Sequence, residues 1–443
     1  MFNNYFNHAC FMTIKEIESL GIVGAGGAGF PTHVKLNSKP DTIIMNAAEC
    51  EPLLHKDMEL ILNYTDKVLL GLKIVMEITG AKQGIIGIKE KHPHEIDLLN
   101  SKVSGNIKVI PIEDIYPAGD EVTLIYMTTK RVVQPGALPI SVGCVVQNVE
   151  TLLNIGLGKP VTDKYVSIAG AVEKPATVRV PVGTTYAEIL SHFKITVDDY
   201  SIRVGGLMMG ALEADLNSVV DKKTGALIVL PSDHHCVNVY NRFALEEYTD
   251  KIAKAACDQC TFCTELCPRY LLGQPVMPNI AMKNRMFSNL EQKVVFAGNF
   301  SCCECNLCTM YACPEGLDPR GATVMEKRWS RELGLKWDGK EAVPHPMNDY
   351  RKVPTQKLMQ RLDVLMFKDE GPLIELNLSS TEVRIPFNKH IGAVSQPIVN
   401  VGQIVNKYEL IARANGQVSS NIHSSIDGIV KNISETEILI QKN

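Results

Sequence analysis

The sequence lacks three features that would each point to a broad class of protein. No apolar run reaches the roughly 18 residues that a membrane-spanning helix needs. Basic residues are not in excess, because the net charge is −4, and this gives no indication of binding to nucleic acid or to an anionic membrane surface. The N-terminus has neither a basic start nor an apolar block, so we expect no secretory signal peptide.

The length and composition are those of an ordinary multidomain globular protein. The chain has 443 residues, of which 45% are hydrophobic and 21% are charged. This length corresponds to about three domains. The periodic pattern of apolar residues begins at Thr13. We therefore expect residues 1–12 to be a tail, or Met12 to be the true start, and a short targeting tail is the alternative.

Cysteine is unevenly distributed along the chain. Of the 13 cysteines, nine lie between residues 257 and 313. A disulfide framework is typical of small secreted chains, whereas this chain is large and has no export signal, so a metal site in a reducing compartment is the better interpretation. We expect the scattered cysteines to be small buried residues rather than ligands. These are Cys10, Cys50, Cys144 and Cys236.

The first cysteine block reads CDQCTFCTELCP and contains Cys257, Cys260, Cys263 and Cys267, followed by Pro268. This is the C-x2-C-x2-C-x3-C-P run of bacterial ferredoxins, which binds a [4Fe–4S] cluster. Two-residue spacers let three thiolates wrap one corner of a cubane, and the proline turns the chain away after the fourth. The block therefore predicts an iron–sulfur cluster.

The second cysteine block reads CCECNLCTMYACP. Cys302, Cys305 and Cys308 repeat the C-x2-C-x2-C spacing, and Cys313 precedes a proline after a four-residue spacer. Cys303 is left over as an extra thiol, which we expect to be a bystander. The alternative is a pair of zinc sites, but zinc usually takes two C-x2-C pairs or adds histidines, and neither pattern fits.

The two blocks together predict crossed ligation, because in two-cluster ferredoxins the fourth cysteine of each run binds the other cluster. One cluster then takes Cys257, Cys260, Cys263 and Cys313, and the other takes Cys267, Cys302, Cys305 and Cys308. Two such clusters carry single electrons, so they need a donor that splits a hydride pair. A flavin does that, and NAD(P)H supplies the pair.

A glycine-rich stretch near the N-terminus reads GAGGAGFPTHVKL. Gly24, Gly26 and Gly29 satisfy the G-x-G-x-x-G pattern, but a dinucleotide fingerprint follows a strand and opens directly into a helix. Here the preceding segment is short and helix-like, and Phe30 and Pro31 follow the last glycine at once. The glycines predict a close approach of the backbone to a ligand, but the pattern alone does not identify the ligand.

Four motifs in order resemble the NADH-binding flavoprotein subunit of respiratory complex I. They are GAGGAGFPT at residues 24–32 with Lys35 beyond it, NAAECEP at 46–52, YPAGDE at 116–121 and QNVETL at 147–152. The resemblance implies that this part of the chain binds FMN and takes electrons from NADH. The contacts that it implies are Gly24, Gly26, Gly27, Gly29, Phe30, Lys35, Asn46, Glu49, Glu51, Tyr116, Asp120, Glu121, Gln147, Asn148 and Thr151.

The residue types in these motifs suit the implied ligands. Glycines let backbone N–H groups approach a phosphate, and Pro31 is favoured at the start of a helix whose N-terminus suits an anion. Lys35, one turn further on, adds a positive charge. The amides of Asn46, Gln147 and Asn148 are suited to flavin ring edges or ribityl hydroxyls.

The acidic residues of the motifs are expected to bind the donor. Glu51 and Glu121 suit ribose hydroxyls or the nicotinamide amide, and a solvated surface carboxylate is the alternative. Tyr116 is either a packing residue or a flavin contact. Three positions depart from the complex I pattern, and they are Ala25, Ser38 and Ala48. These departures bear on the NADH contacts and leave the backbone cradle intact.

The remaining segments predict two modules rich in strands. Residues 165–230 alternate apolar residues with turn signals and a short helix, which predicts a small α+β module. It resembles the soluble-ligand-binding β-grasp (SLBB) domain of complex I and of the Rnf complex C subunit. The C-terminus resembles a barrel-sandwich, lipoyl-like module. Its central hairpin reads ANGQVSSNIHSS and has no acceptor lysine, so we expect a docking or structural role.

The predicted fold is multidomain α/β plus β. Its predicted parts are a Rossmann-like FMN/NADH domain at 13–160, an SLBB β-grasp domain at 161–235, an α-helical ferredoxin-like domain with two [4Fe–4S] clusters at 236–370, and a barrel-sandwich domain at 371–443. This order of domains resembles the cobalamin reductases of propanediol-utilisation microcompartments, over essentially residues 13–443.

That resemblance implies an NADH-dependent oxidoreductase that reduces the corrinoid of a diol dehydratase, in the cytoplasm at a microcompartment shell. A protein acceptor, as in an Rnf-like complex or an amino-acid reductase system, is one alternative. A relay subunit that no longer binds NADH is the other, and the three departures support it. We expect no nucleic-acid partner and no membrane span.

Overall fold

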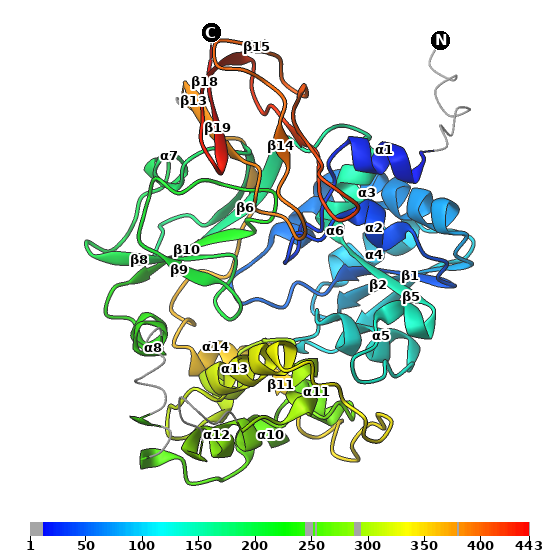
Figure 1. The fold of residues 1–443 in the computed structure, drawn as a ribbon, viewed down its shortest axis with the longest axis vertical. Helices are drawn as coiled ribbons and strands as arrows, with labels where there is room; N and C mark the ends of the chain where they lie inside the picture. Colours follow the sequence, from blue (N-terminus) through cyan, green and yellow to red (C-terminus); the bar gives the residue numbers. More distant parts are fainter. Residues whose placement is uncertain (1–11, 244–250, 253–254, 288–293, 379–380, 443) are drawn as a thin grey trace.

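The computed structural model describes residues 12–243, 251–252, 255–287, 294–378 and 381–442. The N-terminal α/β unit lies beside a unit built on a mixed sheet, the cysteine-rich helices close the bottom, and the C-terminal strands lie at the top (Figure 1). Cys10 and the predicted tail up to residue 11 lie outside the described residues. Within the described part, no helix is both long and apolar enough to cross a bilayer.

The N-terminal unit is built on a parallel sheet with the strand order β3-β2-β1-β5. Its strands are β1 (Thr42–Ala47), β2 (Gln83–Lys89), β3 (Ile107–Ile112) and β5 (Cys144–Asn148). The central strand β1 reads TIIMNA and is buried almost throughout. Parallel strands have this near-continuous apolar character because helices cover both faces of the sheet.

Helices cover the two faces as that pattern requires. The helices around the sheet are α3 (Lys56–Thr79), α4 (Pro93–Lys102), α5 (Glu121–Thr129) and α6 (Val149–Leu157). Ile43 and Met45 of β1 share one core with α3 and α6, and Ile44 shares the opposite core with α5. The predicted α/β class of this unit is confirmed. The glycine-rich loop lies between two short helices, α1 (Ile14–Ser19) and α2 (Thr32–Leu36), and not after a strand.

A six-stranded mixed sheet follows, with the order β12-β7-β6-β10-β8-β9 among the described residues. Its members are β6 (Asp163–Gly170), β7 (Ala176–Pro181), β8 (Tyr200–Val204), β9 (Ala211–Glu213), β10 (Ala226–Pro231) and β12 (Leu373–Ile374). The helix α7 (Tyr186–Ser191) packs on it. The predicted mixture of strands and a short helix is therefore present, whereas the β-grasp assignment stays a prediction.

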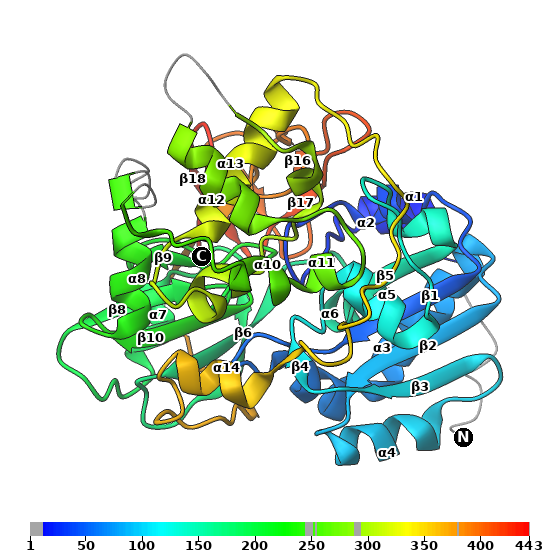
Figure 2. The same cartoon turned by 90° about the horizontal axis from the view of Figure 1, so that it is seen from below.

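The cysteine-rich part is helical. Its helices are α10 (Phe262–Glu265), α11 (Pro268–Leu271), α12 (Pro278–Phe287), α13 (Pro319–Glu332) and α14 (Thr355–Arg361), and α8 (His235–Phe243) leads into it. Seen from below in Figure 2, α11 lies next to α5 of the N-terminal unit. The strand β11 (Val353–Pro354) pairs with β4 (Ile115–Tyr116) and so ties the two units together.

The C-terminal strands form two small sheets, β13-β19-β18-β15 and β14-β16-β17. Their bounds are β13 (Glu382–Pro386), β14 (Gln396–Pro397), β15 (Ile404–Val405), β16 (Leu410–Arg413), β17 (Ile422–His423), β18 (Gly428–Ile433) and β19 (Glu437–Gln441). Pairs of short antiparallel sheets around one apolar core are what a barrel-sandwich module requires.

The lysine-free hairpin between β16 and β17 docks on the N-terminal segment. Asn421 Nδ2 donates to the carbonyl of Glu18 at 3.2 Å. Lys222 Nζ donates to the carbonyls of Gly21 and Asn421, both at 2.7 Å. Burial lowers the pKa of Lys222 to about 7. The hairpin tip therefore joins the C-terminal module to the segment that leads into the glycine-rich loop.

The contact between α3 and α6 depends on two glycines. A Cβ on Gly71 would overlap the carbonyl oxygen of Leu152, and a Cβ on Gly156 would overlap the carbonyl oxygen of Lys67. The helices are therefore in backbone contact there, and the ion pair between Lys56 and Glu150 shows that their N-termini also lie close together.

We predict that Gly156→Ala lowers the free energy of unfolding by about 1–3 kcal/mol or more, because the added methyl group forces the two helices apart. Urea unfolding followed by circular dichroism measures the change. Lys73→Ala on the exposed side of α3 is the control and should stay within about 0.5 kcal/mol of the wild type. A Gly156→Ala protein as stable as the wild type would show that the helices are not in close contact.

Candidate functional site

The glycine-rich loop is closed at its base and open on its outer face. The N–H of Gly24 donates to the carbonyl of Phe30 at 2.9 Å, and Val23 pairs with Pro31 in an isolated β-bridge. Gly29 has φ +72°, which favours glycine. A Cβ on Gly27 would meet nothing within 4 Å. The loop therefore presents backbone to an open space, as a phosphate or flavin cradle must.

The loop is held from below at Ala25, which is 2% exposed. Its N–H donates to Oγ1 of Thr151 at 3.0 Å, and its carbonyl accepts from Nζ of Lys164 at 3.3 Å. A Cβ on the next residue, Gly26, would lie 2.9 Å from the side chain of Asn148. The N-terminus of α6 and one lysine of β6 thus fix the shape of the loop.

Lys164 belongs to a buried charge network beneath the loop. Glu150 forms ion pairs with Lys164 and, at 2.8 Å, with Lys56, which also lies 3.3 Å from Asp57. Burial lowers the pKa of Lys164 to about 8, and the positive charge of Lys56 on the same carboxylate lowers it further, against the attraction of Glu150. Buried charges persist only when they are paired. The network therefore fixes three elements, α3, α6 and β6, around the loop.

Two amides from the QNVETL motif lie at the end of β5. Asn148 caps α6 through Oδ1, which accepts from the N–H of Glu150 at 2.9 Å, and its Nδ2 donates to Asp57 at 2.7 Å. Gln147 is 3% exposed, and its Nε2 has no hydrogen-bond partner among the described residues. A buried amide without a partner is costly unless a ligand satisfies it. This orphaned donor fits a ligand such as the flavin ring.

Other predicted contacts join segments around the loop. Asn46 Nδ2 donates to the carbonyl of Gly119 at 2.9 Å, and Asn46 Oδ1 accepts from the N–H of Ala48 at 3.2 Å. Lys35 forms an ion pair with Glu121. These contacts connect the segment after the glycine-rich loop, the end of β1 and the start of α5, as the order of the motifs implied.

The two acids of the NAAECEP motif already have protein partners. Glu49 caps α3 by accepting the N–H groups of Asp57 at 2.8 Å and Met58 at 3.3 Å. Glu51 accepts the N–H groups of Met208 and Met209, at 2.8 and 2.9 Å, in a loop of the mixed-sheet unit. Burial raises the pKa of Glu51. The structure thus gives Glu51 a role in joining units, and its predicted contact with NADH stays a prediction.

Tyr116 and Asp120 connect the N-terminal unit to the cysteine-rich unit. Tyr116 is 2% exposed, and its hydroxyl donates to the carbonyl of Cys305 at 2.7 Å. Asp120 caps α5 and forms an ion pair at 2.6 Å with Arg269, two residues after Cys267. Asp120 is a predicted nucleotide contact, and Tyr116 is predicted as either a packing residue or a flavin contact. The structure places both at the interface, and their nucleotide contacts stay predictions.

The cysteine neighbours in the structure support crossed ligation, and the ligand sets stay a prediction. Burial, together with the neighbouring thiols of Cys313, Cys260 and Cys257, raises the pKa of Cys263 to about 12. Burial and the nearby Cys302 raise the pKa of Cys267. Thiols in these surroundings need a cluster to hold them as thiolates. We call Cys267, Cys302, Cys305 and Cys308 the inner cysteines, and Cys257, Cys260, Cys263 and Cys313 the outer cysteines.

The two cysteine blocks share one backbone conformation. The residues with positive φ are Gln259, Thr261, Glu304 and Asn306, at 59°, 69°, 61° and 68°. They occupy the same places in the two C-x2-C-x2-C runs. Gln259 Nε2 donates to Cys257 Sγ at 3.1 Å, and the N–H of Glu304 donates to Cys302 Sγ at 3.3 Å. Repeated turns with donors aimed at sulfur fit two cubane clusters.

No three Cys, His, Asp or Glu side chains in the described ranges converge closely enough to bind a single metal ion. The cysteines of a cubane lie farther apart, because irons and sulfides lie between them. Outside the two sets, Cys144 and Cys236 are buried, and Cys50 and Cys303 are half-buried.

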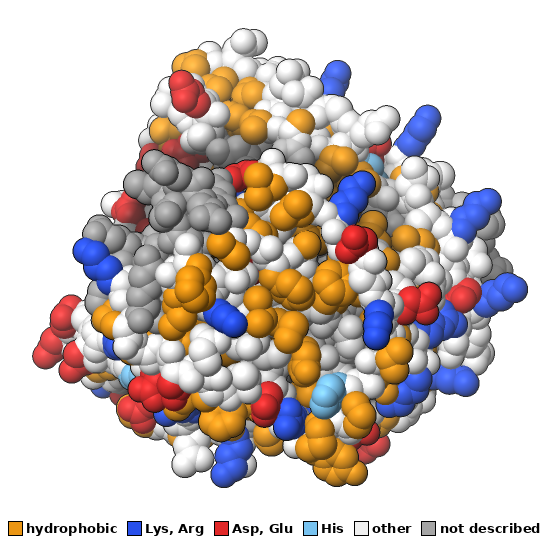
Figure 3. Space-filling model, turned by 60° about the horizontal axis from the view of Figure 1, so that its bottom comes forward, with side chains coloured by type: hydrophobic (Ala, Val, Ile, Leu, Met, Phe, Trp, Pro, Cys, Tyr) orange, Lys and Arg blue, Asp and Glu red, His pale blue; other side chains and the backbone are white. Residues whose placement is uncertain are grey.

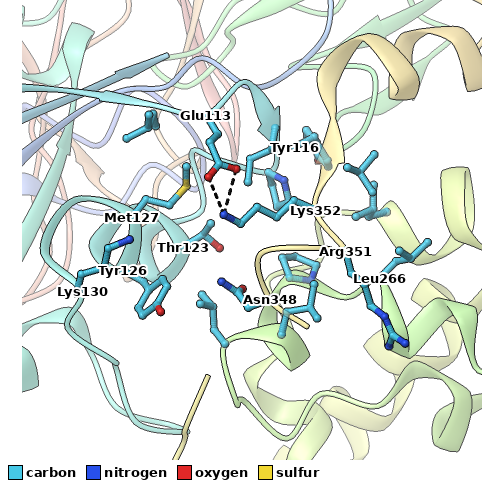
Figure 4. A pocket seen from close by; sticks show the side chains of 18 of the residues that line it. Glu113, Tyr116, Thr123, Tyr126, Met127, Lys130, Leu266, Asn348, Arg351 and Lys352 are labelled. Carbon is cyan, nitrogen blue, oxygen red and sulfur yellow. Dashed lines mark hydrogen bonds and ion pairs between the residues drawn. The ribbon is translucent and has the colours of Figure 1, made fainter. Parts of the chain in front are cut away.

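A cavity of about 220 Å³ lies where the N-terminal unit meets the cysteine-rich part. Figure 4 shows Tyr126 and Met127 of α5 on one side, and Leu266, next to Cys267, on the other. Lys352 and Glu113, joined at 2.8 and 3.0 Å, lie across it. At the cavity, the N-terminal unit and the cysteine-rich part are therefore connected by polar contacts, and side chains do not fill the space between them.

Sequence reasoning missed Lys56, Asp57, Lys164 and Arg269. Lys164 lies at the start of a strand that is otherwise apolar, and that pattern could have identified it as a buried, paired charge. The others lie outside the four motifs and carry no signal by themselves, since only the fold brings their partners near.

We predict that the stability of the protein depends on pH through Glu49. Burial and the neighbouring Asp57 raise its pKa from 4.5 to about 7. Between these values the folded state binds more protons than the unfolded state, so this carboxyl lowers the free energy of unfolding as the pH rises. Glu49→Gln cannot titrate, so its stability relative to the wild type should rise by roughly 2–3 kcal/mol as the pH rises from about 5 to 8.

Chemical denaturation of both proteins at several pH values measures this difference. The exposed Glu77→Gln on α3 is the control, and its difference from the wild type should not change over the same range. If the Glu49→Gln difference is equally flat, the carboxyl is not buried as described.

We predict that Cys313→Ser damages the cluster of the outer cysteines, because its thiol lies near Cys257 and Cys260. The electron paramagnetic resonance (EPR) spectra of Cys313→Ser and Cys257→Ser should then resemble each other. If Cys313→Ser instead matches Cys302→Ser, ligation is local to each block. Cys303→Ser, which removes a thiol outside both sets, is the control and should keep both signals.

Three stretches of the chain match known families. Residues 17–157 match the Nuo51 FMN-binding domain, residues 256–318 the 4Fe-4S dicluster domain, and residues 368–443 the RnfC barrel sandwich hybrid domain. These matches confirm the predicted FMN and [4Fe–4S] cofactors and the predicted barrel-sandwich module. The roles of individual site residues stay predictions.

The NAD+-reducing [NiFe]-hydrogenase in its H2-reduced state overlaps with a TM-score of 0.48 at 18% identity, covering 75% of this chain and 63% of the other. A likeness at this level supports no functional argument. The C subunit of the proton-translocating ferredoxin:NAD(+) oxidoreductase complex of Clostridium ljungdahlii is 31% identical over 64% of this chain and 62% of its own length.

Two relatives match along nearly the whole chain. "Cobalamin reductase PduS" of Citrobacter freundii is 38% identical over 97% of this chain and 96% of its own length. The protein of the same name from Salmonella typhimurium is 38% identical over 96% of this chain and 95% of its own length. The chain therefore belongs to the cobalamin reductase PduS family and is an oxidoreductase with flavin-binding and iron–sulfur domains.

Proposed function

We propose that the protein takes electrons from NADH at an FMN in the glycine-rich cradle and passes them through two [4Fe–4S] clusters to cob(II)alamin. The observation that carries this proposal is the 38% identity to two cobalamin reductases along nearly the full length, with no domain missing from the match. NADH gives up two electrons as a hydride, and each cob(II)alamin takes one. One NADH therefore yields NAD+, one proton and two cob(I)alamin.

Different residues of the chain bind the flavin and the two clusters. The backbone of the glycine-rich loop offers N–H groups to the flavin phosphate, and Gln147 offers its unpaired amide. The inner and outer cysteines hold the clusters, which carry one electron each when present. The loop is fixed by Thr151 and Lys164, so the cradle needs little rearrangement when the flavin binds.

A relay that receives electrons without binding NADH is the second candidate. Its support is specific: Lys35 is neutralised by Glu121, and Glu51 is occupied by Met208 and Met209. The departures from the complex I pattern at Ala25, Ser38 and Ala48 also support a relay that does not bind NADH. A protein acceptor remains an alternative through the likeness to the C subunit of the Clostridium ljungdahlii complex.

The location and partners follow from the same proposal. A corrinoid enzyme is the partner that cob(II)alamin reduction requires. We place the protein in the cytoplasm at a bacterial microcompartment with a shell protein as neighbour, as the resemblance implies. Co-purification with shell proteins from cells grown on a diol tests this placement, and a protein found only outside the shells would contradict it.

We predict that the anaerobically purified protein carries non-covalent FMN, which NADH bleaches without a partner. Gly27→Trp should abolish FMN binding, because the indole fills the space that no other atom occupies within 4 Å of a Cβ. Flavin absorbance and iron analysis measure the two cofactors separately. Gly27→Ala is the control and should keep FMN. Gly27→Trp with full FMN would refute the placement, and FMN that NADH does not bleach would favour the relay.

We predict that Cys260→Ser combined with Cys305→Ser keeps NADH–dye activity and loses most cobalamin reduction, because dyes take electrons from the flavin directly. Anaerobic assays with ferricyanide and with cob(II)alamin on its diol dehydratase compare the two. Equal loss of both activities would indicate a collapsed fold. Full cobalamin reduction without clusters would show that the corrinoid takes electrons from the flavin.

A further inference from the structure

The inner and outer cysteines differ in what surrounds them. Their exposure does not separate them, since Cys263 and Cys313 of one set and Cys267 and Cys305 of the other are all 8% exposed. The packing does. Cys305 belongs to a core shared with the N-terminal unit and the mixed-sheet unit, and its partners there include Leu53, Tyr116, Leu207 and Met208.

The outer cysteines pack in a separate, smaller core. Cys313 and Cys257 lie with Ala281 and Met282 of α12 and with Leu317 and Ala322. All of these residues belong to the cysteine-rich part. Among the described residues, no hydrogen bond or ion pair joins residues 257–263 to the N-terminal unit.

Polar contacts connect the inner cysteines to both neighbouring units. Tyr116 donates its hydroxyl to the carbonyl of Cys305 at 2.7 Å. Arg269, which forms an ion pair with Asp120 at 2.6 Å, has the thiols of Cys303 and Cys302 among its closest charges. Asn306, next to Cys305, donates to the carbonyl of Met208 at 3.2 Å.

The same residues lead back to the flavin cradle. Asp120 follows Gly119, whose carbonyl accepts from Asn46 at the end of β1. Tyr116 has Glu51 as a close charged neighbour. The inner cysteines therefore face the carboxyl ends of the strands, where the cradle lies, whereas the outer cysteines lie beyond them.

The far side of the outer cysteines reaches the molecular surface. Phe262, next to Cys263, is 49% exposed, whereas Cys257 and Cys260 are half-buried like Cys302 and Cys308 of the inner set, so Phe262 marks the surface here. In Figure 1 the helix α10 lies at the bottom of the molecule, and hydrophobic side chains gather in the middle of the face that Figure 3 shows. Electron tunnelling weakens steeply with distance, so the position of each set decides its place in the path.

We propose that the inner cysteines hold the cluster that receives electrons from the flavin, that the outer cysteines hold the cluster that delivers them to the acceptor, and that Tyr116 is a positioning residue between flavin and inner cluster. This order rests on the proposed function only in its donor, the flavin of the cradle. Each cluster gains one electron of the pair, so one NADH reduces both before any acceptor is present.

Two mild substitutions distinguish the clusters without removing them. Gln259→Gly removes the 3.1 Å hydrogen bond to Cys257 and suits the φ of 59° at this position. It should lower the reduction potential of the outer cluster alone, because hydrogen bonds to sulfur raise it. Thr261→Gly, at φ 69° in the same loop and without a bond to sulfur, is the matched control.

The experiment mixes the protein with NADH anaerobically, freezes it at millisecond intervals and records EPR spectra of the reduced clusters. In the wild-type protein, the signal that Gln259→Gly alters should appear second. Cys260→Ser, which removes an outer ligand, assigns that signal independently. If NADH does not reduce the flavin, photoreduction of the bound FMN starts the same sequence. No acceptor is present, so this test stands even if the protein does not reduce cobalamin.

Tyr116→Phe tests the positioning role. The appearance of both signals should slow severalfold, because the inner cysteines lose the hydrogen bond that fixes them against the N-terminal unit, with no change in the rate of flavin reduction or in either potential. Tyr126→Phe on α5 is the control and should leave the rates unchanged. The order is refuted if the Gln259-sensitive signal appears first or together with the other. The role of Tyr116 is refuted if Tyr116→Phe slows neither signal.

Discussion

The buried ion pairs of Glu150 are the interaction on which the site depends. One carboxylate of α6 holds Lys56 of α3 and Lys164 of β6, and Lys164 in turn holds the carbonyl of Ala25. Charges this deeply buried are stable only while all of them are paired, so the three elements cannot shift independently. The shape of the glycine-rich loop is thus fixed by charges that lie outside it.

The units are connected through polar groups at each junction rather than through one large apolar interface. Glu51 accepts from Met208 and Met209, Tyr116 donates to Cys305, and Lys222 connects Gly21 with Asn421. Each of these groups is largely withdrawn from water, so breaking one contact leaves an unpaired polar group behind. This makes the relative placement of cradle and cysteines specific, which electron transfer over a short path requires.

The cofactors were predictable from the sequence because their ligands are close together in the chain. The C-x2-C-x2-C runs and the glycine-rich loop are local motifs, and the backbone bears them out in the repeated left-handed residues Gln259, Thr261, Glu304 and Asn306. Roles of the acids were less predictable. Glu51 and Asp120 bind other units in the structure, because their partners, Met208 and Arg269, are more than a hundred residues away.

The sequence by itself determined the chemistry of this protein: cysteine spacing selects cubane clusters, and glycines without side chains admit a flavin. Only the tertiary structure decided which cysteines face the cradle and what holds the loop. The thiols of the two blocks are alike in type and spacing, so nothing local distinguishes them. The difference arises from packing against Tyr116 and Leu53 on one side and α12 on the other, which long-range contacts alone can set.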